Sequence, residues 1–215
     1  MTKRLKEIFS IIPNCHTFAD IGCDHGYIAK GMLDLNKCSH AIVSDVSAKC
    51  LKKAENLLKD YISAGKVSAV VSDGFEKVGK TDVALIAGMG GEEIIKIVQN
   101  AVILPNVLVL QPMKNCDKVR VELRKTGYKF EKDYVFKAED KFYDLMLLTR
   151  GDDVLTQEEI YFGRTNLQEK GNAFKERLSI EKRKFENLIK GGNLSDVSKE
   201  EFEEKIRRID NLCIL

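Results

Sequence analysis

The sequence lacks several features that mark whole classes of protein. It has no apolar run near the roughly 20 residues that span a bilayer and no continuous apolar stretch after its charged start, so we expect a cytoplasmic protein without a signal peptide. The six cysteines form no Cys-x-x-Cys pair and no histidine has zinc spacing, which predicts buried thiols and no metal site. The net charge of +2 permits nucleic-acid binding without requiring it.

A dinucleotide-binding Gly-x-Gly-x-x-Gly loop is also missing. In its place an apolar run ends at Asp20, and Gly22-Cys23-Asp24-His25-Gly26 leads into a helical pattern at Tyr27. Glycines let backbone approach a ligand, and the helix start offers free N–H groups. A carboxylate here would repel a pyrophosphate but suits the sulfonium and ammonium groups of S-adenosylmethionine. The pattern Asp-x-Gly-x-x-x-Gly resembles the first motif of Rossmann-like methyltransferases that use this cofactor.

Two more acids follow the next two strand-like runs. Asp45 ends the run at 40–44 and lies 25 residues after Asp20, close to the spacing at which an acid meets a nucleoside ribose. Asp73-Gly74 follows the run at 67–71, where an aspartate could accept a hydrogen bond from an adenine amino group. The alternative for both acids is an ordinary turn.

The fourth run, 82–87, leads into Gly88-Met89-Gly90-Gly91, and the fifth, 107–110, into Gln111-Pro112. Three glycines in four residues cost backbone entropy, so they predict a place where cofactor and substrate both need access. Methyltransferases that act on adenine N6 carry Asn/Asp-Pro-Pro-Tyr/Phe after the fourth strand. Its absence argues against N6 chemistry.

Helical patterns alternate with these strands. We expect helices at about 2–12, 26–35, 48–62, 92–99 and 116–126. The strand-like runs are almost continuously apolar, as in a parallel sheet covered on both faces, and the runs at 128–137 and 142–149 read as an antiparallel hairpin. The sequence therefore predicts an α/β, Rossmann-like domain over residues 1–150, with a mostly parallel seven-stranded sheet that ends in this hairpin.

Residues 151–215 predict a second, helical domain. Thr156 to Glu159 and Ser198 to Glu201 read as capping boxes that start helices. Positions that step by four and three form a stripe along each helix, and Gly191-Gly192-Asn193 separates the two helices. They are Phe174, Leu178, Glu181, Phe185 and Leu188 in the first and Phe202, Ile206, Ile209 and Cys213 in the second. We expect an antiparallel, coiled-coil-like hairpin, which either packs as an appendage or embraces a substrate.

Taken in order, these motifs resemble the bacterial TrmK family, the tRNA (adenine-N1)-methyltransferases that act at position 22. The Asp24-His25 pair and the Gly88–Gly91 segment are the most distinctive parts of a resemblance that covers essentially the whole chain. It implies that S-adenosylmethionine is the cofactor and that 1-methyladenosine in tRNA is the product. The residues it implies for the cofactor are Asp20, Gly22, Asp24, His25, Gly26, Asp45, Asp73, Gly74 and Gly88, and those for the target base are Gly88, Met89, Gly90, Gln111 and Pro112.

The expected partner is tRNA, bound by a monomer. Arg120 and Arg124 share a predicted helix face, and Lys182, Arg183 and Lys184 lie on the first helix of the C-terminal hairpin, so these five could contact phosphates unless they form solvated faces. Three alternatives stay open. They are a methyltransferase for another RNA or a small molecule, a non-catalytic nucleotide- or RNA-binding module, and, least supported, a dehydrogenase.

Overall fold

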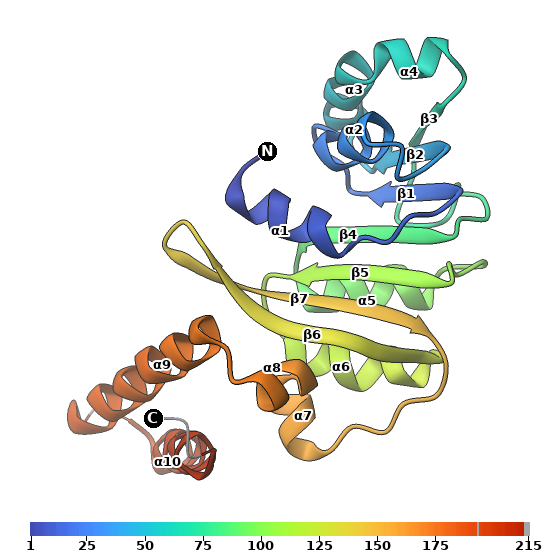
Figure 1. Ribbon diagram of the computed structural model, residues 1–215. Coiled ribbons are helices and arrows are strands. Elements are labelled where there is room, and N and C mark those ends of the chain that lie inside the picture. Colours follow the sequence, from blue (N-terminus) through green and yellow to red (C-terminus); the bar gives the residue numbers. More distant parts are fainter. Residues whose placement is uncertain (193, 213–215) are drawn as a thin grey trace.

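A mixed seven-stranded sheet organises the computed structural model, which describes residues 1–192 and 194–212 (Figure 1). The strands are β1 (Thr17–Ile21), β2 (His40–Asp45), β3 (Val67–Val71), β4 (Val83–Met89), β5 (Val107–Pro112), β6 (Tyr128–Ala138) and β7 (Lys141–Arg150). Their order is β3-β2-β1-β4-β5-β7-β6. The first five pair in parallel, and β7 runs antiparallel to both of its neighbours. The predicted fold class is confirmed.

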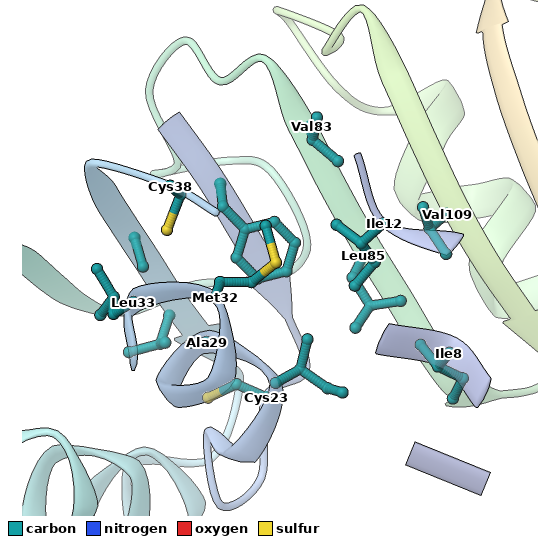
Figure 2. Packing of buried hydrophobic residues seen from close by; sticks show 14 of the residues in the cluster. Ile8, Ile12, Cys23, Ala29, Met32, Leu33, Cys38, Val83, Leu85 and Val109 are labelled. Atoms are coloured by element: carbon teal, nitrogen blue, oxygen red, sulfur yellow. The ribbon is translucent and has the colours of Figure 1, made fainter. Parts of the chain in front are cut away.

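Helices cover both faces of the sheet, as the apolar strand runs predict. They are α1 (Lys3–Ile11), α2 (Tyr27–Asp34), α3 (Ala48–Leu57), α4 (Lys59–Ser63), α5 (Gly91–Gln99) and α6 (Cys116–Lys125). Alternate residues of β4 face opposite sides, since Leu85 packs with α1 and α2 whereas Ile86 packs with α5 and α6. Figure 2 shows the cluster on the α1 side, in which Ile8 of α1 and Ile12, just after α1, pack with Leu85 and Val109.

The helix predicted over 48–62 is two helices, α3 and α4. The backbone leaves helical geometry at Leu58, whose side chain is fully buried. Burial of this side chain against the start of α2 accompanies the change of direction, because a side-chain carbon of Leu58 lies within 3.1 Å of the position that a Cβ would take at Gly26. Tertiary packing therefore interrupts a segment whose apolar stripe predicts one helix.

Four further helices follow the sheet. They are α7 (Gln157–Phe162), α8 (Arg164–Glu169), α9 (Asn172–Lys190) and α10 (Asp196–Asn211). The capping box of Thr156 and Glu159 is confirmed. The second predicted box is wrong, because Ser195 caps α10 and accepts a hydrogen bond from the backbone N–H of Ser198, which therefore lies in the first turn. No helix in the described ranges is both long and apolar enough to cross a membrane.

The C-terminal helices pack against the β6 side of the sheet (Figure 1). Val135 of β6 shares a cluster with Phe162, Phe174 and Ile209. Helices α9 and α10 pair in antiparallel order, with the rings of Phe185 and Phe202 stacked at 5.2 Å. Of the residues in the predicted hairpin, Asn193 and Cys213 lie outside the described ranges. The domain boundary at residue 150 stays a prediction.

Candidate active site

A cavity of about 470 Å³ opens at the carboxyl ends of β1, β2 and β4. In doubly wound sheets this edge is where ligands bind. Eight of the nine cofactor residues predicted from the sequence line the cavity, namely Asp20, Gly22, Asp24, His25, Asp45, Asp73, Gly74 and Gly88. The sheet thus gathers motifs that lie up to 68 residues apart in the chain.

Gly22 forms the floor of the turn after β1. Its backbone N–H and that of Cys23 donate to the carbonyl oxygen of Ser44 at 2.8 and 3.0 Å, which ties the turn to β2. Gly22 has φ +70°, and a Cβ placed on it would lie 2.0 Å from the terminal carbon of Met89. Glycine suits this left-handed backbone conformation, and an added Cβ would have to displace the flexible end of the Met89 side chain.

Gly26 is not among the residues that line the cavity, and its predicted role in cofactor binding stays a prediction. It caps the N-terminus of α2 with φ +71°. A Cβ there would lie 3.1 Å from side-chain carbons of both Ala54 and Leu58. Gly26 therefore allows α2 to approach α3 and α4, and it supports the site indirectly.

Asp20 is the buried acid of the cavity, with 6% of its surface exposed. Burial raises the pKa of its carboxyl to about 7, the N–H of Ala29 in the first turn of α2 opposes this shift, and the negative charge of Asp45 adds to it. A carboxylate in such surroundings is stabilised by a cationic group placed beside it. The geometry suits a positively charged part of a ligand.

The pair Asp24-His25 forms the rim of the cavity. Asp24 adopts φ +45°, and its carboxylate accepts a hydrogen bond from Lys53 Nζ at 3.0 Å. His25 Nε2 lies 3.6 Å from the same carboxylate, and its ring stacks on Tyr27 with centroids 5.4 Å apart. These side chains are partly exposed, so they can contact both solvent and a bound ligand.

Asp45 and Asp73 hold the other side of the cavity. The Asp45 carboxylate accepts hydrogen bonds from the backbone N–H groups of Ser47 at 2.8 Å and Asp24 at 3.4 Å, which fix its orientation. Carboxylate oxygens can accept further bonds, so Asp45 can still bind hydroxyl groups. Asp73 is exposed at the cavity wall, and Gly74 beside it packs closely on Ile97, which also lines the cavity.

The glycine-rich end of β4 divides into two roles. Gly88 and Met89 line the cavity, and the pairing of β4 with β5 shifts register between Ala87 and Met89. Gly90 and Gly91 do not line it. A Cβ on Gly91 would lie within 2.7 Å of the carbonyl oxygens of Lys114 and Asn115, so that glycine is needed for packing before α6.

Gln111 is fully buried beneath Arg4, a residue that the sequence motifs missed. The amide oxygen of Gln111 accepts from Arg4 Nη1 at 3.0 Å, and its amide nitrogen donates to the carbonyl oxygen of Pro112 at 3.1 Å. Pro112 lines a neighbouring cavity with Tyr143. The roles predicted for Gln111 and Pro112 at a target base stay predictions. Arg4 lines the main cavity, but nothing except its place on the polar side of a short amphipathic helix marks it in the sequence.

The predicted phosphate-binding residues separate into exposed and internal ones. The prediction for Arg120 is wrong, because its side chain is 1% exposed and donates to both carboxylate oxygens of Asp133 at 2.6 and 2.9 Å. Lys182 pairs with Asp210 across α9 and α10. Arg183 and Lys184 are exposed and Arg124 is half-buried, so their predicted contacts stay predictions.

Comparisons with known proteins agree with this geometry. The family described as methyltransferase domain matches residues 1–146. A Mycoplasma pneumoniae protein, described as a candidate tRNA methyltransferase, is 33% identical over 126 residues, which are 56% of this chain and 58% of that protein. The tRNA (adenine(22)-N(1))-methyltransferase of Bacillus subtilis is 29% identical over 157 residues, covering 71% of this chain and 66% of that protein. The matched region thus spans less than two thirds of either relative.

A solved structure extends the likeness to the whole fold. The structure of Mycoplasma capricolum TrmK with S-adenosyl-homocysteine superimposes with a TM-score of 0.89 at 21% identity and covers 100% of this chain and 98% of that one. This match includes the C-terminal helices. The resemblance to the TrmK family that the motifs indicate is confirmed.

Proposed function

This chain belongs to the methyltransferase-domain family, and we propose that it transfers a methyl group from S-adenosylmethionine to N1 of the adenosine at position 22 of tRNA. One observation carries the proposal. The cavity brings five carboxylates and a glycine floor together at the switch edge of the sheet, where a nucleoside with cationic groups fits. The B. subtilis relative is named for this reaction.

The residues of the cavity fit the cofactor part by part. Asp20 is the partner for the ammonium group, because it is a buried acid beside the backbone of Gly22. Asp45 can accept from the two ribose hydroxyls, and Asp73 from the adenine amino group. At Gly22 the end of the Met89 side chain occupies the space that a Cβ would fill, so both residues border the place of the cofactor.

For this reaction the protein has to position the two reactants, and it does not have to transfer a proton first. When bound, S-adenosylmethionine supplies an electrophilic methyl group next to a positively charged sulfur. Adenine N1 already carries an in-plane lone pair, so no base is needed before it attacks. The backbone at Gly88 and Met89 therefore has to orient the base, and such positioning lowers the barrier without a charged catalyst.

The carboxylates of the cavity face the cofactor and not the base, because Asp20, Asp24 and Asp45 surround the space in front of β1 and β2. The target edge of a base in folded tRNA is engaged in pairing, so we expect local opening or flipping before transfer.

A route for the RNA leads away from this cavity toward the C-terminal helices. A second cavity of about 420 Å³ lies between Pro112 and α9 and is lined by Lys141 and Lys184, and by Arg177, which is paired with Asp144 and Glu181. Basic side chains beside the target-base end support tRNA as the substrate, because phosphate contacts supply most of the affinity for nucleic acid. Helix α9 would then form part of the binding surface.

The test is methyl transfer from S-adenosylmethionine to a panel of unmodified tRNA transcripts, with the modified base mapped afterwards. We expect 1-methyladenosine at position 22 and none in matched transcripts that carry guanosine there. Methylation at another site, or of a small molecule in place of tRNA, would show that the proposed substrate is wrong. Absence of any S-adenosylmethionine binding would overturn the proposed enzymatic function and favour a non-catalytic binding module.

A further inference from the structure

The charge balance of the cavity is uneven. Five carboxylates line it, those of Asp20, Asp24, Asp45, Asp73 and Glu93. Among its lining residues, all within the described ranges, Arg4 is the only lysine or arginine. A ligand with both cationic groups and one anionic group would find many partners for the first and a single guanidinium for the second.

Arg4 is held in place by a neutral partner and not by an acidic one. Its Nη1 donates to the neutral amide oxygen of Gln111 at 3.0 Å, and its guanidinium lies 5.7 Å from the ring centre of Tyr143. It forms no ion pair with any residue in 1–192 or 194–212. A guanidinium has five donors, so most of them remain for a ligand.

Arg4 and Asp20 lie over the same face of the sheet. Asp20 pairs in register with Leu85 and Ala87 pairs with Gln111, and Leu85 and Ala87 project to the side covered by α1. A Cβ on Gly88 would lie 3.5 Å from Arg4 Nη1. The guanidinium therefore borders the methionine end of the cavity, next to the buried carboxylate.

The rival anion site at this end is the N-terminus of α2. Its third N–H, that of Ala29, already interacts with the Asp20 carboxylate. A second carboxylate at the same helix end would have to share the partial positive charge that Asp20 already uses. Arg4 offers the one position where an anionic group gains a full positive charge.

We propose that Arg4 binds the carboxylate of the amino-acid end of S-adenosylmethionine, while Asp20 binds the ammonium group of the same end. This inference deepens the proposed function and rests on it. Helix α1 then belongs to the cofactor site, although it precedes the glycine motif in the chain. It packs on the same face of the sheet as α2.

The experiment is calorimetric titration of the full chain with two ligands, S-adenosylmethionine and its decarboxylated form, which lacks only the carboxylate. The variants are Arg4→Met, Arg4→Lys and, as a matched control on the exposed side of α1, Lys6→Met. We expect Arg4→Met to weaken S-adenosylmethionine binding by roughly 10- to 100-fold, the value of a charge-assisted hydrogen bond. Binding of the decarboxylated ligand should stay within about twofold, the charge-keeping Arg4→Lys should lose less, and Lys6→Met should behave as wild type.

Several outcomes would overturn the inference. Arg4→Met could weaken both ligands equally, weaken neither, or leave S-adenosylmethionine binding intact while raising the KM for tRNA, in which case the guanidinium serves an RNA phosphate. If Arg4→Met does not fold, the wild-type protein still decides, because equal affinity for the two ligands would exclude a carboxylate contact. A wild type that binds neither ligand overturns the proposed function itself, whereas binding without this selectivity overturns only the role of Arg4.

Discussion

Two parts of this molecule concentrate charge, and they do so in opposite ways. The cofactor cavity collects five carboxylates around one guanidinium. The junction between the hairpin β6–β7 and the C-terminal helices places Arg120 and Arg177 against Asp133 and Asp144. The cavity has an excess of negative charge, whereas the positive and negative charges of the junction are paired with one another.

The junction is saturated by its own contacts. Arg120 donates to both oxygens of Asp133, lies 3.4 Å from Asp144, and donates to the backbone carbonyl of Ile160 at 3.1 Å. Arg177 of α9 donates to the other oxygen of Asp144 at 2.7 Å. These bonds join α6, both strands of the hairpin, α7 and α9, so the cluster holds the two parts of the chain together.

The difference teaches how to separate a structural cluster from a binding site. A buried charge persists only if it is paired, and in the junction each pair is complete inside the protein. In the cavity Asp20 is buried with a raised pKa and Arg4 lacks an acidic partner among the described residues. The imbalance indicates a ligand that completes the pairs.

The largest effect should come from breaking the balanced cluster. Arg120→Met leaves Asp133 buried without its partner, which typically costs about 3–5 kcal/mol. Urea unfolding measures the loss. Lys125→Met on the same helix removes an exposed pair with Glu122 and should cost less than about 1 kcal/mol. Equal losses would show that the junction is not the main connection.

The next largest effect concerns Asp20 and pH. Because the folded protein keeps the Asp20 proton up to about pH 7 and the unfolded chain loses it near pH 4, the stability of the ligand-free protein should fall as pH rises between these values. Asp20→Asn removes this slope. We expect the stability of this variant relative to wild type to increase between pH 5 and pH 8, by on the order of 2–4 kcal/mol.

Cofactor binding by Asp20→Asn should change in the opposite direction. The variant should bind S-adenosylmethionine at least about tenfold more weakly, because the ammonium loses its charged partner. Wild-type affinity should rise with pH toward 7 and then level off. A variant whose stability relative to wild type does not increase between pH 5 and pH 8 would contradict the assignment of Asp20 as a destabilising, ligand-binding acid.

A smaller effect should distinguish the backbone strain of an alanine at positive φ from a change in the shape of the cavity. Gly22→Ala and Gly65→Ala both place alanine at φ +70°, but only Gly22 has a neighbour within 4 Å. Both should lose about 1–2 kcal/mol from the left-handed backbone. Only Gly22→Ala should also weaken S-adenosylmethionine binding, by roughly tenfold or more, in a titration. Equal affinities in the two variants would exclude Gly22 from the binding floor.

The smallest effect tests the exposed cations of α9. The double variant Arg183→Gln with Lys184→Gln should weaken tRNA binding about threefold to tenfold and reduce the slope of log affinity against log salt by up to about 2. Lys59→Gln with Lys80→Gln, an exposed lysine at the start of α4 and another in the loop before β4, is the matched control. An unchanged slope in the α9 variant would remove that helix from the RNA surface.

The parallel strands and most of the residues that line the cavity could be predicted from the sequence, because the signals for them lie within short stretches of the chain. Each acid directly follows an apolar run, and parallel strands bring their carboxyl ends to one edge of the sheet. Asp20, Asp45 and Asp73 could therefore be placed together without knowledge of side-chain contacts.

What could not be predicted depends on distant contacts. Arg120 occupies a polar position of its helix pattern, and its acidic partners lie 13 and 24 residues further along, on a hairpin whose docking the pattern does not reveal. The spacing of Gly26 and Gly91 does not reveal that a Cβ on them would meet α3 and the loop before α6. Arg4 reaches Gln111 across 107 residues.

The position of β7 has a consequence for how the chain is made. This strand is the last of the sheet to be synthesised, yet it lies between β5 and β6 and pairs Val107 with Thr149. Until residue 150 has emerged, the outer edge of β5 has no partner and offers a row of free backbone groups to other chains. A nascent chain that stalls near residue 126 would hold the complete cofactor cavity and still expose this edge, so newly made protein needs protection from aggregation during that interval.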